Sequence, residues 1–94
     1  MCIICRGEDI SHLTILDCNG CQNITTLPPL PAGLEWLLCA NTGLTSIPQL
    51  PEGLTLLVCH YCKVLTQLPE LPDGLGELGC SGCTGLISLP QLPL

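Results

Sequence analysis

Apolar residues recur along this chain at a fixed interval of 20 or 21 residues. The clearest copy is the stretch LGELGCSGCTGLISLPQL, which begins at Leu75. Three earlier stretches align with it and begin at Leu13, Leu34 and Leu54, so successive copies start 21, 20 and 21 residues apart. Such a period is typical of a solenoid, in which each repeat packs only against its neighbours. The copies divide the chain into an N-terminal cap, residues 1–12, and four repeats, residues 13–33, 34–53, 54–74 and 75–94.

The first part of each repeat has the spacing of a short β-strand. Leu16 is followed two residues later by Cys18, and side chains two apart point to the same face of a strand. Strands at this interval can stack as a parallel ladder about 4.8 Å apart. We therefore expect a curved parallel sheet with an inner face of Leu and Cys. The inward columns are Leu13, Leu34, Leu54, Leu75; Leu16, Leu37, Leu57, Leu78; Cys18, Cys39, Cys59, Cys80; Ile24, Leu44, Leu65, Leu86; Leu27, Ile47, Leu68, Leu89; and Leu30, Leu50, Leu71, Leu92.

Proline governs the second part of each repeat, which carries Pro-x-Leu-Pro, as in residues 48–51. Proline fixes φ, donates no backbone hydrogen bond and pushes the preceding residue to extended geometry. The convex side of the solenoid is therefore expected to be an extended, polyproline-like return with little or no α-helix. Gly33, Gly53 and Gly74 stand where the chain turns into the next strand, and we expect them to supply a dihedral angle that other residues resist.

The complete pattern, L-x-x-L-x-C-x-x-C-x-x-L-x-x-L-P-x-L-P-x-G, resembles the leucine-rich repeat family over nearly all of the chain after residue 12. The short repeat with Pro-x-Leu-Pro is similar to the bacterial-effector type, and the Cys-x-x-Cys variant is similar to arrays encoded by giant viruses of amoebae. The resemblance implies a non-catalytic module that presents a curved sheet to a protein partner. It leaves open, as an alternative, a structural component of a larger assembly such as a viral particle.

The charge balance argues against several classes of partner. The chain carries a net charge of −6, and Arg6 and Lys63 are its only Arg and Lys residues. There is no basic stripe to meet phosphates, so neither nucleic acid nor an anionic membrane is an expected partner. No apolar run is long enough to span a membrane, and no signal peptide is evident. We expect the cytoplasm or another reducing compartment, with a virion as a further location.

Nine cysteines invite three interpretations. The pairs Cys59–Cys62 and Cys80–Cys83 have the spacing of a zinc ribbon, C-x2-C-x17-C-x2-C, which makes a zinc-stabilised domain one alternative. Stacked disulfides are another. We favour structural, reduced cysteines, because the motif recurs at the leucine period and Thr42 replaces the second cysteine in one repeat while every apolar column persists. The first cysteine then fills a core position. The second occupies a ladder position that the family resemblance assigns to Asn or Cys, where it satisfies backbone groups.

The residues between the inward columns define the candidate binding face. Ile15, Trp36 and Leu56 are expected to lie side by side, with Leu38 beside Val58. An exposed apolar patch that contains Trp and Tyr is typical of an interaction site, although apolar residues at these positions also simply favour strands. The predicted partner-binding residues are Ile15, Trp36, Leu38, Leu56, Val58, His60 and Tyr61. We find no nucleophile elbow, phosphate loop or paired acid, and we expect no enzyme activity, cofactor or metal.

The two ends of the solenoid carry separate expectations. Residues 2–5, Cys-Ile-Ile-Cys, are interpreted as a short strand that caps the first repeat, with residues 6–9 as a polar turn. The roles of Cys2 and Cys5 stay open. The fourth repeat has no capping segment after it, so one flank of its Leu and Cys column is expected to pack on another copy or another protein.

Overall fold

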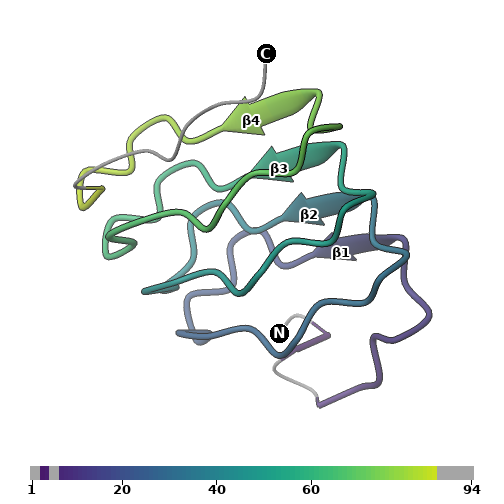
Figure 1. The fold of residues 1–94 in the computed structure, drawn as a ribbon. Coiled ribbons are helices and arrows are strands. Elements are labelled where there is room, and N and C mark those ends of the chain that lie inside the picture. The colour runs from purple at the N-terminus through teal and green to yellow at the C-terminus, as the bar shows by residue number, and fades with distance from the viewer. Residues whose placement is uncertain (1–2, 5–6, 87–94) are drawn as a thin grey trace.

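The chain folds as a solenoid of four parallel strands with no helix among the residues that the structure describes. The computed structural model describes residues 3–4 and 7–86, and the strands are β1 (Ile15–Asp17), β2 (Trp36–Leu38), β3 (Leu56–Val58) and β4 (Glu77–Gly79). They form one sheet in chain order, and each strand pairs in parallel with the next (Figure 1). The predicted fold class, a repeat solenoid with a parallel sheet and little helix, is confirmed.

The register of the sheet follows from the repeat. Leu16 pairs with Leu37, Leu37 with Leu57, and Leu57 with Leu78, so the second leucine of every repeat lies in one column. Three of these four leucines are completely buried. A one-residue slip would expose the whole column to water, and this penalty fixes the register.

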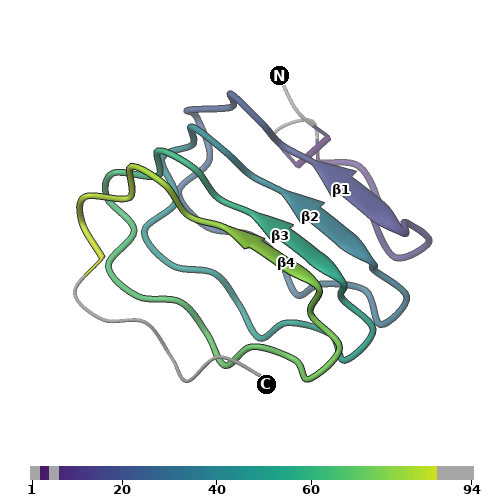
Figure 2. The same cartoon turned by 90° about the horizontal axis from the view of Figure 1, so that it is seen from above.

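The core lies between the sheet and the returning chain. Figure 2 shows the strands side by side, with the return segments forming the opposite wall. The described inward positions from the second repeat to residue 71 are all buried, as the periodicity predicted. They are Leu34, Leu37, Cys39, Leu44, Ile47, Leu50, Leu54, Leu57, Cys59, Leu65, Leu68 and Leu71. Leu89 and Leu92 lie outside the described residues.

The return segments carry neither helix nor strand in the described residues, apart from a single bridge residue at Gln67. Each described segment ends in the same tight turn, in which a leucine N–H donates to the carbonyl oxygen of the last proline. The bonds run from Leu34 to Pro31, from Leu54 to Pro51 and from Leu75 to Pro72, at 3.1, 3.2 and 3.1 Å.

The prediction for the turn glycines is wrong. Gly33, Gly53 and Gly74 are not among the glycines with positive φ, and a Cβ atom added to any of them would meet nothing within 4 Å. These turns can therefore be made by residues with ordinary dihedral angles. The residues with left-handed geometry lie elsewhere in the repeat, just beyond the ends of the strands.

The N-terminal region also differs from the expected capping strand. Ile3 and Ile4 lie in a turn that is closed by hydrogen bonds from Gly7 N–H to the Ile4 carbonyl and from Glu8 N–H to the Ile3 carbonyl. Ile10 is buried, and the Leu13 N–H donates to its carbonyl at 3.0 Å, as in the turns that end at Pro31 and Pro51. A turn over two isoleucines satisfies the backbone locally and still packs both side chains against the core. Cys2 and Cys5 lie outside the described residues.

Candidate binding face

Two rows of side chains cross the exposed face of the sheet. The first row follows the register Ile15, Trp36, Leu56 and Glu77, and the second follows Asp17, Leu38, Val58 and Gly79. We call the surface formed by these eight residues the exposed sheet face. The register thus places Ile15, Trp36 and Leu56 side by side, and Leu38 beside Val58. The described structure brings all of these predicted residues onto one surface.

The apolar members of this face keep substantial exposure. Trp36 is 44% exposed and Ile15 is 47% exposed, while Leu38, Leu56 and Val58 are half-buried. Trp36 therefore leaves a large apolar ring in water that folding alone does not cover. Val64, which is 52% exposed, was not predicted as a surface apolar residue and lies in a turn beyond β3.

The chain turns out of every strand through a residue with a left-handed backbone. The aligned positions are Gly20 (φ 79°), Asn41 (φ 56°), Tyr61 (φ 60°) and Gly82 (φ 73°). Gly adopts this region freely and Asn tolerates it, whereas a bulky residue is strained there. Tyr61 is the strained member of the column, and its ring is 57% exposed. A Cβ atom on Gly82 would clash with the Tyr61 ring, so the glycine leaves space for that ring.

His60 and Asn19 hold neighbouring repeats together rather than facing solvent freely. The Asn19 Oδ1 accepts a hydrogen bond from the Ala40 N–H at 2.7 Å, and the His60 Nδ1 accepts one from the Ser81 N–H at 3.0 Å. The imidazole therefore carries its proton on Nε2 when it makes this bond. A Cβ atom on Gly79 would lie 2.6 Å from His60 Nε2, so the ring lies over β4. His60 is half-buried and contributes to the stacking of repeats.

In the third and fourth repeats the second cysteine bonds to the backbone of the preceding repeat, as the ladder interpretation predicted. The Cys62 thiol donates to the Cys39 carbonyl oxygen at 3.0 Å, and the Cys83 thiol donates to the Cys59 carbonyl oxygen at 2.8 Å. Thr42 occupies the equivalent position in the second repeat, but its hydroxyl donates to the Cys39 carbonyl of its own repeat at 3.1 Å. A small side chain with a donor is what this position requires.

Thiol ionisation inside the core is controlled by burial and by contacts between cysteines. The contact with Cys62, together with burial, raises the pKa of the Cys39 thiol far above its ordinary value. Burial and the charge of Cys83 likewise raise the pKa of Cys59. The contact with Cys39, with help from Thr42, lowers the pKa of Cys62, so Cys62 ionises before Cys39. The hydrogen bond from the Cys62 thiol to the Cys39 carbonyl belongs to the protonated form of Cys62.

The described cysteines are not arranged as a metal site. Free thiols are carried by Cys39, Cys59, Cys62, Cys80 and Cys83. Residues 3–4 and 7–86 contain no group of three or more His, Cys, Asp or Glu side chains that could hold a metal ion. Cys59, Cys62, Cys80 and Cys83 have zinc-ribbon spacing, but Cys59 and Cys62 are completely buried in the repeat core.

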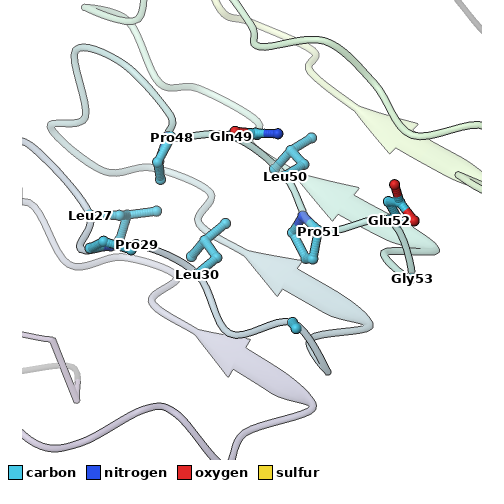
Figure 3. A pocket seen from close by; sticks show the side chains of 10 residues that line it. Leu27, Pro29, Leu30, Pro48, Gln49, Leu50, Pro51, Glu52 and Gly53 are labelled. Carbon is cyan, nitrogen blue, oxygen red and sulfur yellow. The ribbon is translucent and has the colours of Figure 1, made fainter.

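The convex side carries a shallow hollow between successive return segments. It has a volume of about 670 Å³ and lies between the segment that contains Leu27 and Leu30 and the one that contains Leu50 and Pro51 (Figure 3). Its lining is more apolar than polar, and Gln49 and Glu52 are its polar side chains. The hollow has no aromatic side chain and no left-handed residue in its lining, so the exposed sheet face remains the stronger candidate.

No protein-family model, curated protein or solved structure matched the chain significantly. No helix among the described residues is long and apolar enough to cross a membrane.

Proposed function

We propose that this chain is a non-catalytic protein-binding module of the leucine-rich repeat family, of the short Pro-x-Leu-Pro type. Its binding surface is the exposed sheet face, centred on Trp36, Leu38, Leu56 and Val58, with Ile15 and Tyr61 as neighbours. The observation that carries the proposal is the 44% exposure of Trp36 in the middle of an apolar row. Trp and Tyr are the residues that most often dominate binding at protein interfaces.

The free thiols support a reducing location for this function. Cys39, Cys59, Cys62, Cys80 and Cys83 carry free thiols, and the first three are buried where oxidation would disturb the core. We therefore propose the cytoplasm or another reducing compartment. A place within a virion is the narrower form of the same proposal, and it rests only on the resemblance of the cysteine-bearing repeat to giant-virus arrays.

Replacing Trp36 with alanine is expected to weaken partner binding about tenfold or more while the chain still folds, because the ring is an exposed anchor. The measurement is quantitative capture of partner proteins from an extract of the source cells by immobilised wild type and variant. Circular dichroism confirms that both are folded.

Val64→Ala is the matched control for this experiment. Val64 is as exposed as Trp36 but lies in a turn away from the exposed sheet face, so it should retain the partner. Equal retention by the Trp36→Ala variant and wild type would contradict the proposed surface. Equal losses in the Trp36→Ala and Val64→Ala variants would instead indicate non-specific apolar adhesion.

A second candidate is a structural role in which the fourth repeat packs against another copy or another protein. Leu75, Leu78, Cys80 and Cys83 are only partly buried, whereas their counterparts in the preceding repeat, Leu54, Leu57, Cys59 and Cys62, are completely buried. In the described part of the chain no strand pairs with the outer edge of β4. Unpaired strand edges favour association.

Self-association through this repeat predicts concentration-dependent sedimentation. In sedimentation velocity the weight-average mass should rise with protein concentration, and Trp36→Ala should not change that rise, because it lies on a different surface. A mass that stays monomeric over the whole concentration range would contradict the structural candidate. A rise that Trp36→Ala abolishes would assign the contact to the exposed sheet face instead.

A further inference from the structure

The exposed sheet face is apolar at its centre and acidic at two opposite corners. Asp17 begins the second row on β1, and Glu77 ends the first row on β4. Both residues are exposed, and Glu35 adds a third exposed carboxylate beside Trp36. The half-buried apolar residues Leu38, Leu56 and Val58 lie between these charges.

No cation of the described chain lies on this surface to neutralise it. Lys63 lies in the turn beyond β3, and Arg6 lies outside the described residues. The whole chain carries a net charge of −6, so the long-range field around the face is also negative. Asp17 accepts a hydrogen bond from the Asn19 N–H at 3.0 Å, which leaves its charge intact.

We propose that the occupant of the exposed sheet face is an extended peptide segment of a partner protein, with an aliphatic centre and a Lys or Arg at each end. This inference rests on the proposed function and specifies its partner class. Cations at the ends would meet Asp17 and Glu77, while the centre covers Trp36. Complementary charges of this kind set the specificity and the association rate of an interface.

The geometry of the sheet also sets the spacing of the two cations. Asp17 and Glu77 are three strands apart across the sheet and two residues apart along it. At about 4.8 Å per strand and about 3.3 Å per residue, the diagonal is about 16 Å at the backbone. An extended peptide covers that distance in about five residues. Because side chains of an extended peptide alternate between two faces, two cations that both face the sheet are expected about four or six positions apart.

A second copy of the chain and a nucleic acid fit this face less well. A second copy would bring its own acidic corners and its own net charge of −6 to the contact. A nucleic acid would bring phosphates against Asp17, Glu35 and Glu77. In both pairings like charges meet with no cation of the face between them, and like-charge contacts disfavour association.

The test begins with selection from a phage-displayed library of random dodecapeptides on the immobilised chain at low salt. Selected peptides are then synthesised without Trp and titrated against the protein. Trp36 is the chain's only Trp, so its fluorescence reports occupancy of the exposed sheet face directly. We expect enrichment of peptides with two Lys or Arg residues about four or six positions apart around aliphatic residues. Their affinity should fall on raising the salt from about 0.05 M to about 0.3 M, because exposed charges are screened.

Two double variants with the same net charge distinguish the effect of the Asp17 and Glu77 carboxylates from the effect of the net charge of the whole chain. Asp17→Asn with Glu77→Gln removes both corner charges, and the new Asn can still accept from Asn19. Glu52→Gln with Glu70→Gln makes the same change in net charge on the convex side, where both residues are exposed. The corner variant should lose affinity for the selected peptides about fivefold to tenfold, and the convex variant less than about twofold.

Each result supports or overturns the inference. Selected peptides that perturb Trp36 but are neutral or acidic would overturn the inference and leave the proposed function standing. Equal losses in the two charge variants would also overturn it, because only the net charge would then matter. If no selected peptide perturbs Trp36, the proposed function fails and the inference fails with it. Trp36 fluorescence that changes with protein concentration alone would assign the face to a second copy.

Discussion

Replacing Leu57 with alanine is expected to lower the free energy of unfolding by about 3–5 kcal/mol. Leu57 is completely buried and lies in register between Leu37 and Leu78, so no neighbouring repeat can collapse into the space without disturbing its own column. Domains of ordinary stability have only about 5–15 kcal/mol in total. The substitution is therefore expected to leave a chain that is marginally folded. Urea unfolding followed by circular dichroism gives the value.

Leu78→Ala provides the internal control, because it makes the same substitution in the same column one repeat later. Leu78 is only partly buried, so we expect a loss of about 1–2 kcal/mol. If both variants lose the same stability, the fourth repeat is covered as fully as the third in solution. A second copy packed on this flank would produce that outcome, so equal losses would support the structural candidate.

The inward columns and the register could be read from the sequence because one physical constraint fixes both. Each repeat must bury its leucines against the next one, so a period of 20 or 21 residues forces Leu37, Leu57 and Leu78 into line. The same constraint places Trp36 beside Leu56 on the opposite face of the sheet. Strand pairing thus follows from spacing alone. What binds to that face does not follow from spacing, and remains a prediction.

The column of residues with left-handed backbone geometry was not predicted, because the turn glycines were expected to adopt that geometry instead. Gly33, Gly53 and Gly74 recur at the obvious turns, yet ordinary dihedral angles suffice there. The sequence did contain a signal, because Gly20, Asn41 and Gly82 align just beyond their strands. Gly and Asn are the residues that adopt this geometry most readily. Tyr61, at the third of the four aligned positions, interrupts this pattern of Gly and Asn and has the strained backbone.

Two further features depend on contacts that a single sequence does not specify. His60 was predicted as an exposed residue of the face, but its ring bonds to the Ser81 N–H because glycine at position 79 leaves room for it. Ile10 was assigned to a cap outside the repeat, yet its carbonyl accepts from Leu13 as Pro31 accepts from Leu34. Position 10 holds isoleucine where the aligned turns hold proline, so the motif that marks those turns is absent from this one.

The chain is expected to lose stability steeply above pH 9, because the buried thiols of Cys39 and Cys59 must stay protonated in the folded state. The pKa values of Cys39 and Cys59 are raised in the folded protein above the ordinary value of 9.0. The stability that these two groups contribute is complete below pH 9 and is lost as the pH rises toward their folded pKa values, since only the unfolded chain releases their protons. Above pH 9, each of these two thiols lowers the free energy of unfolding by about 1.4 kcal/mol per pH unit. The chain should therefore lose roughly 3 kcal/mol of stability by pH 10.

The ionisation of Cys62 does not change how steeply the free energy of unfolding falls above pH 9. Its pKa is lowered to about 5, so its contribution is present above pH 9 and is lost as the pH falls through about 5. The measurement is urea unfolding at pH 8 to 10.5 with a non-thiol reductant present. Cys59→Ala is the control, because it removes one raised thiol and keeps the contact between Cys39 and Cys62 that is the largest cause of the raised pKa of Cys39. Above pH 9 the free energy of unfolding of this variant should fall less steeply than that of wild type, by about 1.4 kcal/mol per pH unit, whatever stability the substitution removes at pH 7. Equal slopes in the variant and wild type would show that Cys59 ionises as readily in the folded chain as in the unfolded one.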